Sequence, residues 1–324
     1  MEKPKFRFRR LRQTNGLREL MRETRVHAED LILPIFVEEG IDAQVAIASM
    51  PGVVRYPESG LANAVTEAWD SGVRAVLLFG VSHNKDANGS DTWNDDGLMA
   101  RIIHSAKQAQ PEMVVISDNC FCEYTDHGHC GVVENDDVDN DRTLQNLVKQ
   151  AVVAVKAGAD MIAPSGMMDG MIAALREGLD IAGFSHTPIM SYSTKFASAF
   201  YGPFREAVDS TFKGTRDTYQ MSVANGREAV AESMQDEAEG ADILMVKPGT
   251  AFLDIIYRIR QKTTKPLAVY HVSGEYAMIK AAAAAGVIDE NAIVEETMIA
   301  FKRAGADLII TYYAKELAAK LTTQ

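Results

Sequence analysis

Three cysteines lie close together in this chain, in the segment CFCEYTDHGHC at 120–130. They are Cys120, Cys122 and Cys130, and the sequence has no others. An odd, clustered set does not indicate a disulfide framework, whereas thiolates beside imidazoles are typical zinc ligands. Two arrangements are open: a closed site with His127 or His129 as fourth ligand, and an open site that leaves a position for water or substrate. We favour the open site, because closed sites usually take their ligands from two separated pairs.

Two lysines follow apolar runs that read as buried strands. Lys247 ends DILMVK at 242–247, and Lys195 lies just past PIMSYS at 188–193. Both amines would point into one cavity from the strand ends. A lysine that is desolvated or faces another cation has a lowered pKa and becomes a nucleophile that can form a Schiff base with a carbonyl compound. A single lysine is ordinarily a solvated surface charge, so the pairing favours this chemistry.

A segment that combines aromatic residues, glycine and cations follows the first of these lysines. It reads FASAFYGPFREAVDSTFKGTRDTYQ at 196–220 and carries Arg205, Lys213 and Arg216. This composition is typical of a lid over an anionic substrate, since arginine can bind a carboxylate through two parallel hydrogen bonds. The competing interpretation is a solvated, charged loop.

Hydroxyl and carboxylate side chains stand at the ends of further apolar runs. Ser273 and Tyr312 could bind a substrate carboxylate, although Ser273 could equally cap a helix and Tyr312 could belong to the core. Asp118, which ends MVVISD, could orient a substrate or accept a proton. Asp169 is a weaker candidate for the same role.

These side chains require elements that bring many strand ends to one face. Eight short apolar runs recur, with helical patterns between them, at 31–37, 73–80, 113–118, 160–164, 188–193, 242–247, 266–272 and 307–313. Strands that alternate with helices predict parallel βαβ units, and eight strands are the number in a (β/α)8 TIM barrel, an α/β fold. The long polar segments follow the strands, so the predicted active site lies at their C-terminal ends.

The first 30 residues do not follow this pattern. We therefore expect an N-terminal arm for subunit contact at 1–30 and a catalytic barrel at 31–324. Six of the first twelve residues are basic, on a chain with 33 Lys+Arg, 45 Asp+Glu and a net charge of −12. Such an arm could dock on a neighbouring subunit or be a frayed terminus. The acidic balance argues against nucleic-acid binding, and no apolar run reaches the roughly 20 residues that span a membrane, so we expect a cytoplasmic protein.

Long ordered motifs of this chain resemble the porphobilinogen synthase (5-aminolevulinate dehydratase) family, in its zinc-dependent bacterial type. They include RRLR, LPIFV, MPGV, CFCEYTDHGHCG, SYSTKFAS, FYGPFRE, ADILMVKPG, VYHVSGEYAMIKAAAA and KRAGADLIITYYAKELA. The resemblance implies a TIM barrel whose extended N-terminal arm wraps a neighbour in a homo-octamer. It also implies the asymmetric condensation of two 5-aminolevulinate molecules to porphobilinogen with loss of two waters, a step of tetrapyrrole and heme biosynthesis.

The resemblance further implies roles for single residues. Lys195 and Lys247 match the catalytic lysines that bind the two substrates as Schiff bases, and the three cysteines match the ligands of a catalytic zinc ion. One substrate's carboxylate would be held by arginines of the lid and the other's by two hydroxyl groups. The residues matched to substrate binding are Arg205 and Arg216, then Ser273 and Tyr312. We add Asp118 to the expected substrate-binding residues from its position at a strand end, not from the resemblance. Glu232 matches a carboxylate near an allosteric magnesium ion, which Arg10 or Arg12 of a neighbouring arm would contact.

Two other functions stay open. A different Schiff-base aldolase or lyase on the same barrel would explain Lys247 but would give the cysteines no role. A zinc-binding interaction protein or redox sensor would explain the cysteine cluster but would leave the two lysines without a role. Chelation separates the first alternative from the synthase, and borohydride trapping of 5-aminolevulinate on Lys247 separates the second.

Overall fold

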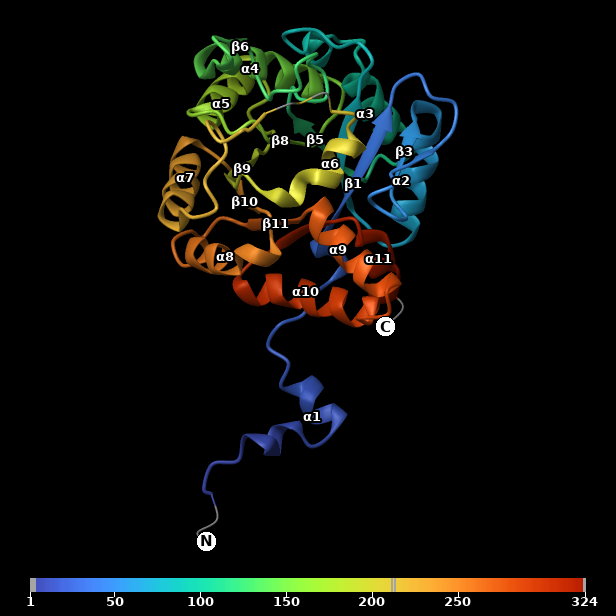
Figure 1. The fold of residues 1–324 in the computed structure, drawn as a ribbon, viewed down its shortest axis with the longest axis vertical. Helices are drawn as coiled ribbons and strands as arrows, with labels where there is room; N and C mark the ends of the chain where they lie inside the picture. Colours follow the sequence, from blue (N-terminus) through green and yellow to red (C-terminus); the bar gives the residue numbers. More distant parts are fainter. Residues whose placement is uncertain (1–3, 211, 213, 323–324) are drawn as a thin grey trace.

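Eight parallel strands form a nearly closed barrel in this computed structural model, which describes residues 4–210, 212 and 214–322 (Figure 1). The barrel strands are β1 (Leu31–Glu38), β4 (Ala75–Val81), β5 (Val114–Asn119), β8 (Met161–Pro164), β9 (Met190–Lys195), β10 (Ile243–Lys247), β11 (Leu267–His271) and β12 (Leu308–Thr311). Their order in the sheet is β8-β5-β4-β1-β12-β11-β10-β9. A bridge between Ile162 and Ile189 joins the two ends. Each predicted apolar run overlaps one strand, so the predicted TIM barrel is confirmed.

Helices surround the strands, except α6 (Gly202–Ala207), which lies across the mouth of the barrel. The surrounding helices are α2 (Leu61–Asp70), α3 (Leu98–Ala109), α4 (Asn140–Lys156), α5 (Met171–Ile181), α7 (Gly226–Glu239), α8 (Leu253–Arg260), α9 (Ser273–Ala284), α10 (Glu290–Ala304) and α11 (Ala314–Thr322). Short 3-10 helices are η2 (Ala28–Asp30), η3 (Glu58–Gly60), η4 (Ser90–Trp93), η5 (Ala199–Tyr201) and η6 (Thr250–Phe252). Small strands are β2 (Val45–Ala46) and β3 (Val54–Pro57) beside β1, and the hairpin of β6 (Val133–Glu134) and β7 (Asp137–Val138).

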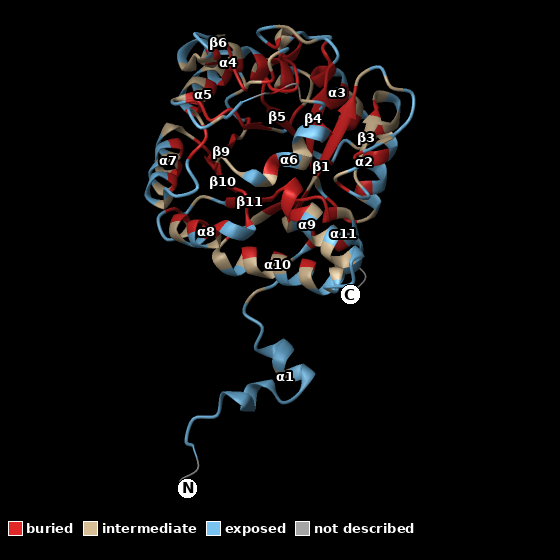
Figure 2. Cartoon of the chain, in the orientation of Figure 1, coloured by how far each residue is buried: buried red, intermediate tan, exposed pale blue. Residues whose placement is uncertain are grey.

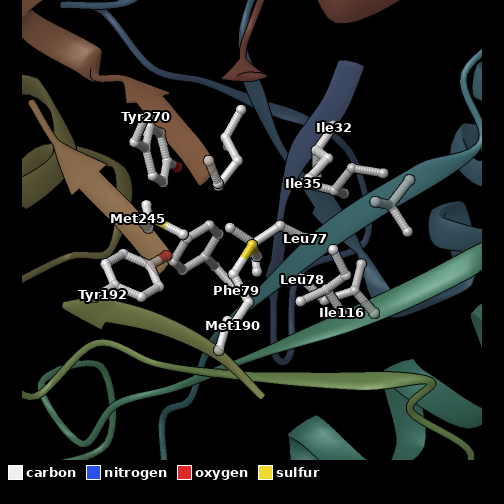
Figure 3. Packing of buried hydrophobic residues seen from close by; sticks show 14 of the residues in the cluster. Ile32, Ile35, Leu77, Leu78, Phe79, Ile116, Met190, Tyr192, Met245 and Tyr270 are labelled. Carbon is white, nitrogen blue, oxygen red and sulfur yellow. The ribbon is translucent and has the colours of Figure 1, made fainter. Parts of the chain in front are cut away.

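The strands are buried on both faces, which explains their continuous apolar sequences. Figure 2 shows buried residues on the strands and on the inner sides of the helices, while the outer sides of the helices are exposed. Inside the barrel, branched and sulfur-containing side chains such as Ile32, Leu77, Ile116 and Met190 fill the space between the strands (Figure 3). This packing holds the strand ends in fixed relative positions.

A repeated aspartate fixes the other end of the barrel. Helix-to-strand connections carry Gly-Ala-Asp at 158–160, 240–242 and 305–307. In each case the aspartate accepts a hydrogen bond from a backbone N–H at or next to the start of a neighbouring strand. The pairs are Asp160 with Val115 (2.8 Å), Asp242 with Ile189 (2.9 Å) and Asp307 with Leu267 (2.9 Å). These bonds satisfy backbone donors that would otherwise be unpaired at the strand starts.

The N-terminal arm extends away from its own barrel (Figures 1 and 2). From residue 4 it contains η1 (Phe8–Arg12) and α1 (Asn15–Leu20). The apolar side chains of Phe6, Phe8 and Leu20 are exposed there. Within the described part of the chain, no helix is long and apolar enough to cross a membrane.

Candidate active site

The two lysines are neighbours across the sheet. Lys195 ends β9, Lys247 ends β10, and their Cα atoms are paired in the register of these parallel strands. Side chains at paired positions point to the same face. Each lysine is only 5% exposed, and each Nζ lies over the ring of Tyr192, at 5.7 Å for Lys195 and 5.0 Å for Lys247. The predicted pairing of two amines inside the barrel mouth is therefore present.

The two amines have different surroundings. The Nζ of Lys195 donates a hydrogen bond of 2.5 Å to the carbonyl oxygen of Ser165. The Nζ of Lys247 makes no hydrogen bond among the described residues and lies among aromatic rings instead. The distances to the ring centres are 4.3 Å for Tyr270, 5.0 Å for Tyr192, 5.2 Å for Phe204 and 5.5 Å for Tyr201. Two of these rings, Tyr192 and Tyr270, are seen inside the barrel in Figure 3.

This environment favours the neutral form of the Lys247 amine. Burial, followed by the positive charge of Lys195, lowers the pKa of Lys247 to about 7. A substantial fraction of its amine is therefore neutral near pH 7, as attack on a carbonyl carbon requires. Asp118 is connected to this pair through Ser165. Its Oδ2 accepts a hydrogen bond of 3.2 Å from the Ser165 hydroxyl, and the carbonyl oxygen of Ser165 accepts one from Lys195. Burial and the charge of Glu123 raise the pKa of Asp118 to about 7.

A buried carboxylate fixes the turn that follows Lys247. Glu275, in the first turn of α9, accepts backbone hydrogen bonds from Val272 (2.7 Å), Gly249 (3.4 Å) and Thr250. Its bond to Val272 is part of the normal capping of α9, and the other two tie that helix to the strand end that carries Lys247. Glu275 thus helps to hold the strand end that carries Lys247 in place.

The three cysteines form a compact buried cluster. Each is 1–3% exposed, their sulfur atoms all lie within 4.8 Å of one another, and the Sγ atoms of Cys120 and Cys122 are 3.3 Å apart. Zn–S bonds of about 2.3 Å in a tetrahedral site place sulfurs about 3.8 Å apart. The donor set and the spacing therefore fit a soft metal ion such as zinc. Glu123 adjoins the cluster through a 3.2 Å hydrogen bond from Cys122.

Neither histidine of the loop joins the sulfurs among the described residues. His127 lies within 3.1 Å of the Ala87 carbonyl oxygen through Nε2, and His129 contacts the hydroxyl of Tyr219 through Nδ1, also at 3.1 Å. The closed arrangement with three cysteines and a histidine is thus not the geometry observed. An open coordination position therefore stays a prediction, and carboxylate oxygens of Asp118 and Glu123 lie within 4.8 Å of the Cys120 sulfur.

The pKa values of the three thiols are shifted in opposite directions by their mutual contacts. Hydrogen bonds from Cys120 and Cys122, and then the cation of Arg216, lower the pKa of Cys130 well below its usual range. Hydrogen bonds to Cys120 and Cys130, followed by burial, raise the pKa of Cys122. A bound cation would remove this conflict, because metal ligation favours the thiolate form of every cysteine.

One cavity of about 250 Å³ brings the lysines and the thiol loop together. Its lining includes Cys122, Glu123, Lys195, Arg205, Arg216 and Lys247. Arg216 donates a 2.8 Å hydrogen bond to the carbonyl of Gly128 in the thiol loop. Both arginines lie against the ring of Phe212, at 5.5 Å for Arg205 and 4.7 Å for Arg216. Cations of the proposed lid therefore reach the same space as the lysines, while Lys213 lies outside the described residues.

Helix α6 lies across the barrel mouth as the central part of the predicted lid (Figure 1). Its Glu206 accepts hydrogen bonds from the backbone of Ala48 (3.0 Å) and Ser49 (3.2 Å) in the β2–β3 region. The ring of Phe204 packs at 5.4 Å from that of Phe79 and closes the inner side. Contacts to segments far away in the sequence therefore hold the lid in position.

The two predicted hydroxyl residues lie behind the cavity wall. Ser273 Oγ accepts a hydrogen bond from the N–H of Phe204 (2.9 Å) and donates one to the carbonyl of Phe200 (3.3 Å), so it holds the lid and does not cap its own helix. The Tyr312 hydroxyl lies 3.4 Å from that of Tyr270, whose ring covers Lys247. Among the described residues that line the cavity, neither Ser273 nor Tyr312 is present.

The sequence-based interpretation did not include the aromatic residues around Lys247 or the anchor at Glu275. Tyr270 could have been noticed as a tyrosine inside the apolar run PLAVYHV. Glu275 follows Val272 at the spacing of a capping carboxylate. Phe204 gave no local signal, because its position depends on how the lid folds back over the strands.

Glu232 lies in a separate acidic cavity of about 470 Å³. The carboxylates lining it are Asp137, Asp169, Asp217, Glu228 and Glu232. Burial, followed by the charges of Asp169, Glu228 and Glu239, raises the pKa of Glu232. Asp217 and Gln220 line both this cavity and the lysine cavity, so the end of the lid separates the two.

Comparison with known proteins assigns this architecture to a family. A family model described as Delta-aminolevulinic acid dehydratase matches residues 5–320. The chain is 58% identical over 312 residues to the Delta-aminolevulinic acid dehydratase of Escherichia coli (strain K12), with 96% of each chain covered. The chain belongs to the delta-aminolevulinic acid dehydratase family. Its relative of that name from Archaeoglobus fulgidus is 51% identical over 321 residues, with 99% of each chain covered.

A solved delta-aminolevulinic acid dehydratase from Toxoplasma gondii ME49 has the same fold. It matches with a TM-score of 0.96 at 44% identity, covering 99% of this chain and 92% of its own. That crystal structure is in complex with the reaction product porphobilinogen. The family predicted from the motifs is therefore confirmed. Membership in the delta-aminolevulinic acid dehydratase family argues against both alternatives, an unrelated aldolase and a sensor protein.

Proposed function

We propose that this chain condenses two 5-aminolevulinate molecules to porphobilinogen with loss of two waters. The observation that carries the proposal is the pair of buried lysines, aligned on β9 and β10, at one cavity that Cys122 of the three-thiol cluster also lines. The substrate offers a ketone for an amine, a carboxylate for a cation and an amine for a Lewis acid. The lysines match the ketone and the arginines match the carboxylate, while the thiols would hold the Lewis acid.

Lys247 and Lys195 would bind the two substrates as Schiff bases. The neutral amine attacks the ketone carbon, the carbinolamine loses its oxygen as water, and a C=N bond remains. Asp118, which is linked to Lys195 through Ser165, is placed to receive and return protons in these steps. The rings around Lys247 exclude water, which keeps the amine neutral and protects the Schiff base from hydrolysis.

Unlike anchors would distinguish the two substrate molecules. Arg205 and Arg216 would hold one carboxylate, since both reach the cavity from the lid. Ser273 and Tyr312 would hold the other, and Ser273 must then exchange its present hydrogen bonds to the lid for bonds to the substrate. Fixing two reactants in this way can lower a barrier by about 7–11 kcal/mol.

Cys120, Cys122 and Cys130 would hold a catalytic zinc ion. When bound, zinc would supply Lewis-acid chemistry to an amine or a carbonyl oxygen of the substrate. Glu232, in the acidic cavity, would lie near an allosteric magnesium ion, contacted by Arg10 or Arg12 of a neighbouring arm. The projecting arm and its exposed apolar side chains support a homo-octamer in which each arm wraps another subunit.

A metal analysis paired with a product assay tests the proposal. We expect zinc to copurify with the chain, porphobilinogen to form from 5-aminolevulinate, and a chelator to remove both the metal and the turnover. Borohydride with 5-aminolevulinate should give a covalent adduct on Lys247 by mass spectrometry. Porphobilinogen formation that survives complete metal removal would overturn the catalytic role of the metal. An adduct without porphobilinogen would favour an aldolase, and no adduct would favour a sensor.

A further inference from the structure

Both ends of the thiol loop are held by one helix, α4. At the first end, the side-chain Nε2 of Gln150 donates a buried hydrogen bond of 2.8 Å to the carbonyl oxygen of Cys120. At the other end, just past Cys130, the hydroxyl of Thr143 accepts a hydrogen bond of 3.0 Å from the N–H of Val132. Gln150 is 2% exposed and Thr143 is 1% exposed. The helix thus contacts the loop immediately at its first cysteine and two residues after its last.

The spacing on α4 makes this double contact possible. Thr143 and Gln150 are seven residues apart, so two helical turns place both side chains on the same face. The Thr143 hydroxyl also donates to the carbonyl of Asp139 (2.6 Å), which fixes its rotamer. Close packing adds to the hydrogen bonds, since a Cβ on Gly131 would collide with the Thr143 side chain. The face of α4 therefore sets how far apart the two ends of the loop can lie.

Gln150 is not placed there for stability alone. Its Oε1 is buried and has no hydrogen-bond partner among the described residues. A buried amide with an unpaired acceptor is unfavourable compared with an apolar side chain of the same size. The hydrogen bond that its side chain does make is the one to the backbone of a cysteine. This arrangement is expected of a residue selected for positioning.

We propose that Gln150 and Thr143 are positioning residues that bring the three cysteine sulfurs to ligand spacing before a metal ion binds. This inference rests on the proposed metal site and names the residues that organise it. In a loop with free ends, gathering three thiolates costs conformational entropy and brings like charges together. When α4 holds both ends, folding already orders the loop, so metal binding loses less conformational entropy and the metal affinity is higher.

Zinc affinity measured by competition with a chromophoric chelator tests the proposal on the full chain. Gln150→Met and Thr143→Val each keep the volume and remove one hydrogen bond to the loop. We expect each to bind zinc about tenfold to a hundredfold more weakly than the wild type, the range for residues that orient metal ligands. Thr143→Ser keeps the hydroxyl, so this variant should bind zinc nearly as tightly as the wild type.

A matched control separates positioning from general loss of stability. Leu147 lies on the same helix, is buried, and is an apolar core residue with no hydrogen bond from its side chain to the loop. Leu147→Ala should lower the Tm measured by circular dichroism and leave zinc affinity unchanged. The inference is overturned if Gln150→Met and Thr143→Val bind zinc as the wild type does, or if Leu147→Ala weakens binding as much as they do. Wild-type protein that binds no zinc would overturn the proposed metal site as well, so the two failures differ.

Discussion

The two lysines line one cavity, which the cysteine cluster reaches through Cys122, but lysines and cysteines are held in different ways. Lys195 and Lys247 lie on strands, and the hydrogen-bonded register of β9 and β10 sets their relative position. The cysteines lie on a loop, whose ends are held by side chains of α4. In the first region the backbone supplies the geometry, whereas in the second region it comes from a few side chains.

The site therefore has an amine half, formed by Lys195 and Lys247, and a thiol half, formed by the three cysteines, which should respond differently to substitutions. A strand register is maintained by many hydrogen bonds and by the packed barrel interior, so it persists when one side chain changes. A loop that depends on a few contacts responds to each of them. The amine half should therefore survive loss of the thiol half, and the thiol half should survive loss of either amine.

The largest expected effect comes from removing the nucleophile. Lys247→Ala should reduce porphobilinogen formation to below about 1% of the wild type, because no other side chain can form the same Schiff base. Circular dichroism should show a folded barrel, and zinc content should be unchanged. Lys262→Ala, at an exposed lysine after α8, is the control and should be fully active. Activity above about 5% in Lys247→Ala would contradict the role of this amine.

Removing one thiol tests the other half. Cys122→Ala should lower zinc content and should reduce turnover by at least about a hundredfold, because a Lewis acid contributes several kcal/mol to such reactions. Borohydride should still trap 5-aminolevulinate on Lys247, since the strand register does not depend on the loop. His127→Ala, in the same loop but away from the sulfurs, should keep its zinc. A zinc-free Cys122→Ala variant with normal turnover would show that the metal has no catalytic role.

The same comparison explains how much of the molecule could be predicted from its sequence. Apolar runs locate strands, and the residue that ends a strand of a parallel barrel lies at its active face, so Lys195 and Lys247 could be placed without a structure. The cysteines could be recognised by their type and spacing. The contacts that hold their loop in place could not be recognised. Gln150 is 30 residues from Cys120 along the chain and lies on a helix whose sequence gives no sign of that contact.

The position of the lid was even harder to predict from the sequence. Its composition predicted contact with an anion, yet its position depends on Glu206 binding the backbone at Ala48 and on Phe204 packing on Phe79. Ser273 was matched to a substrate carboxylate through family resemblance, and in this structure it bonds to the lid. Contacts of this kind form only when distant segments fold together, so local sequence patterns contain little information about them.

A smaller effect is expected from the interaction between the two amines. Lys247 must be neutral to attack, so the rate of adduct formation with 5-aminolevulinate should fall about tenfold per pH unit below its pKa of about 7 and level off above it. Burial is the larger cause of that low pKa, and the charge of Lys195 is the second. Lys195→Met removes this charge, so the pKa of Lys247 should rise and the midpoint should move upward by up to about one pH unit. Cyanoborohydride trapping across pH measures the shift, and Lys149→Met, an exposed site on α4, is the control.

Stability should vary with pH in the direction that this low pKa requires. An unfolded lysine has a pKa of about 10.4, so between pH 7 and that value the unfolded chain binds one proton more at Lys247 than the folded chain does. The contribution of Lys247 to the free energy of unfolding therefore rises with pH, by at most about 1.4 kcal/mol per unit. Denaturant unfolding of the wild type and of Lys247→Met should differ by this slope. Parallel curves would mean that the amine is solvated, and the distinction between a strand-held nucleophile and a loop-held metal site would lose its electrostatic basis.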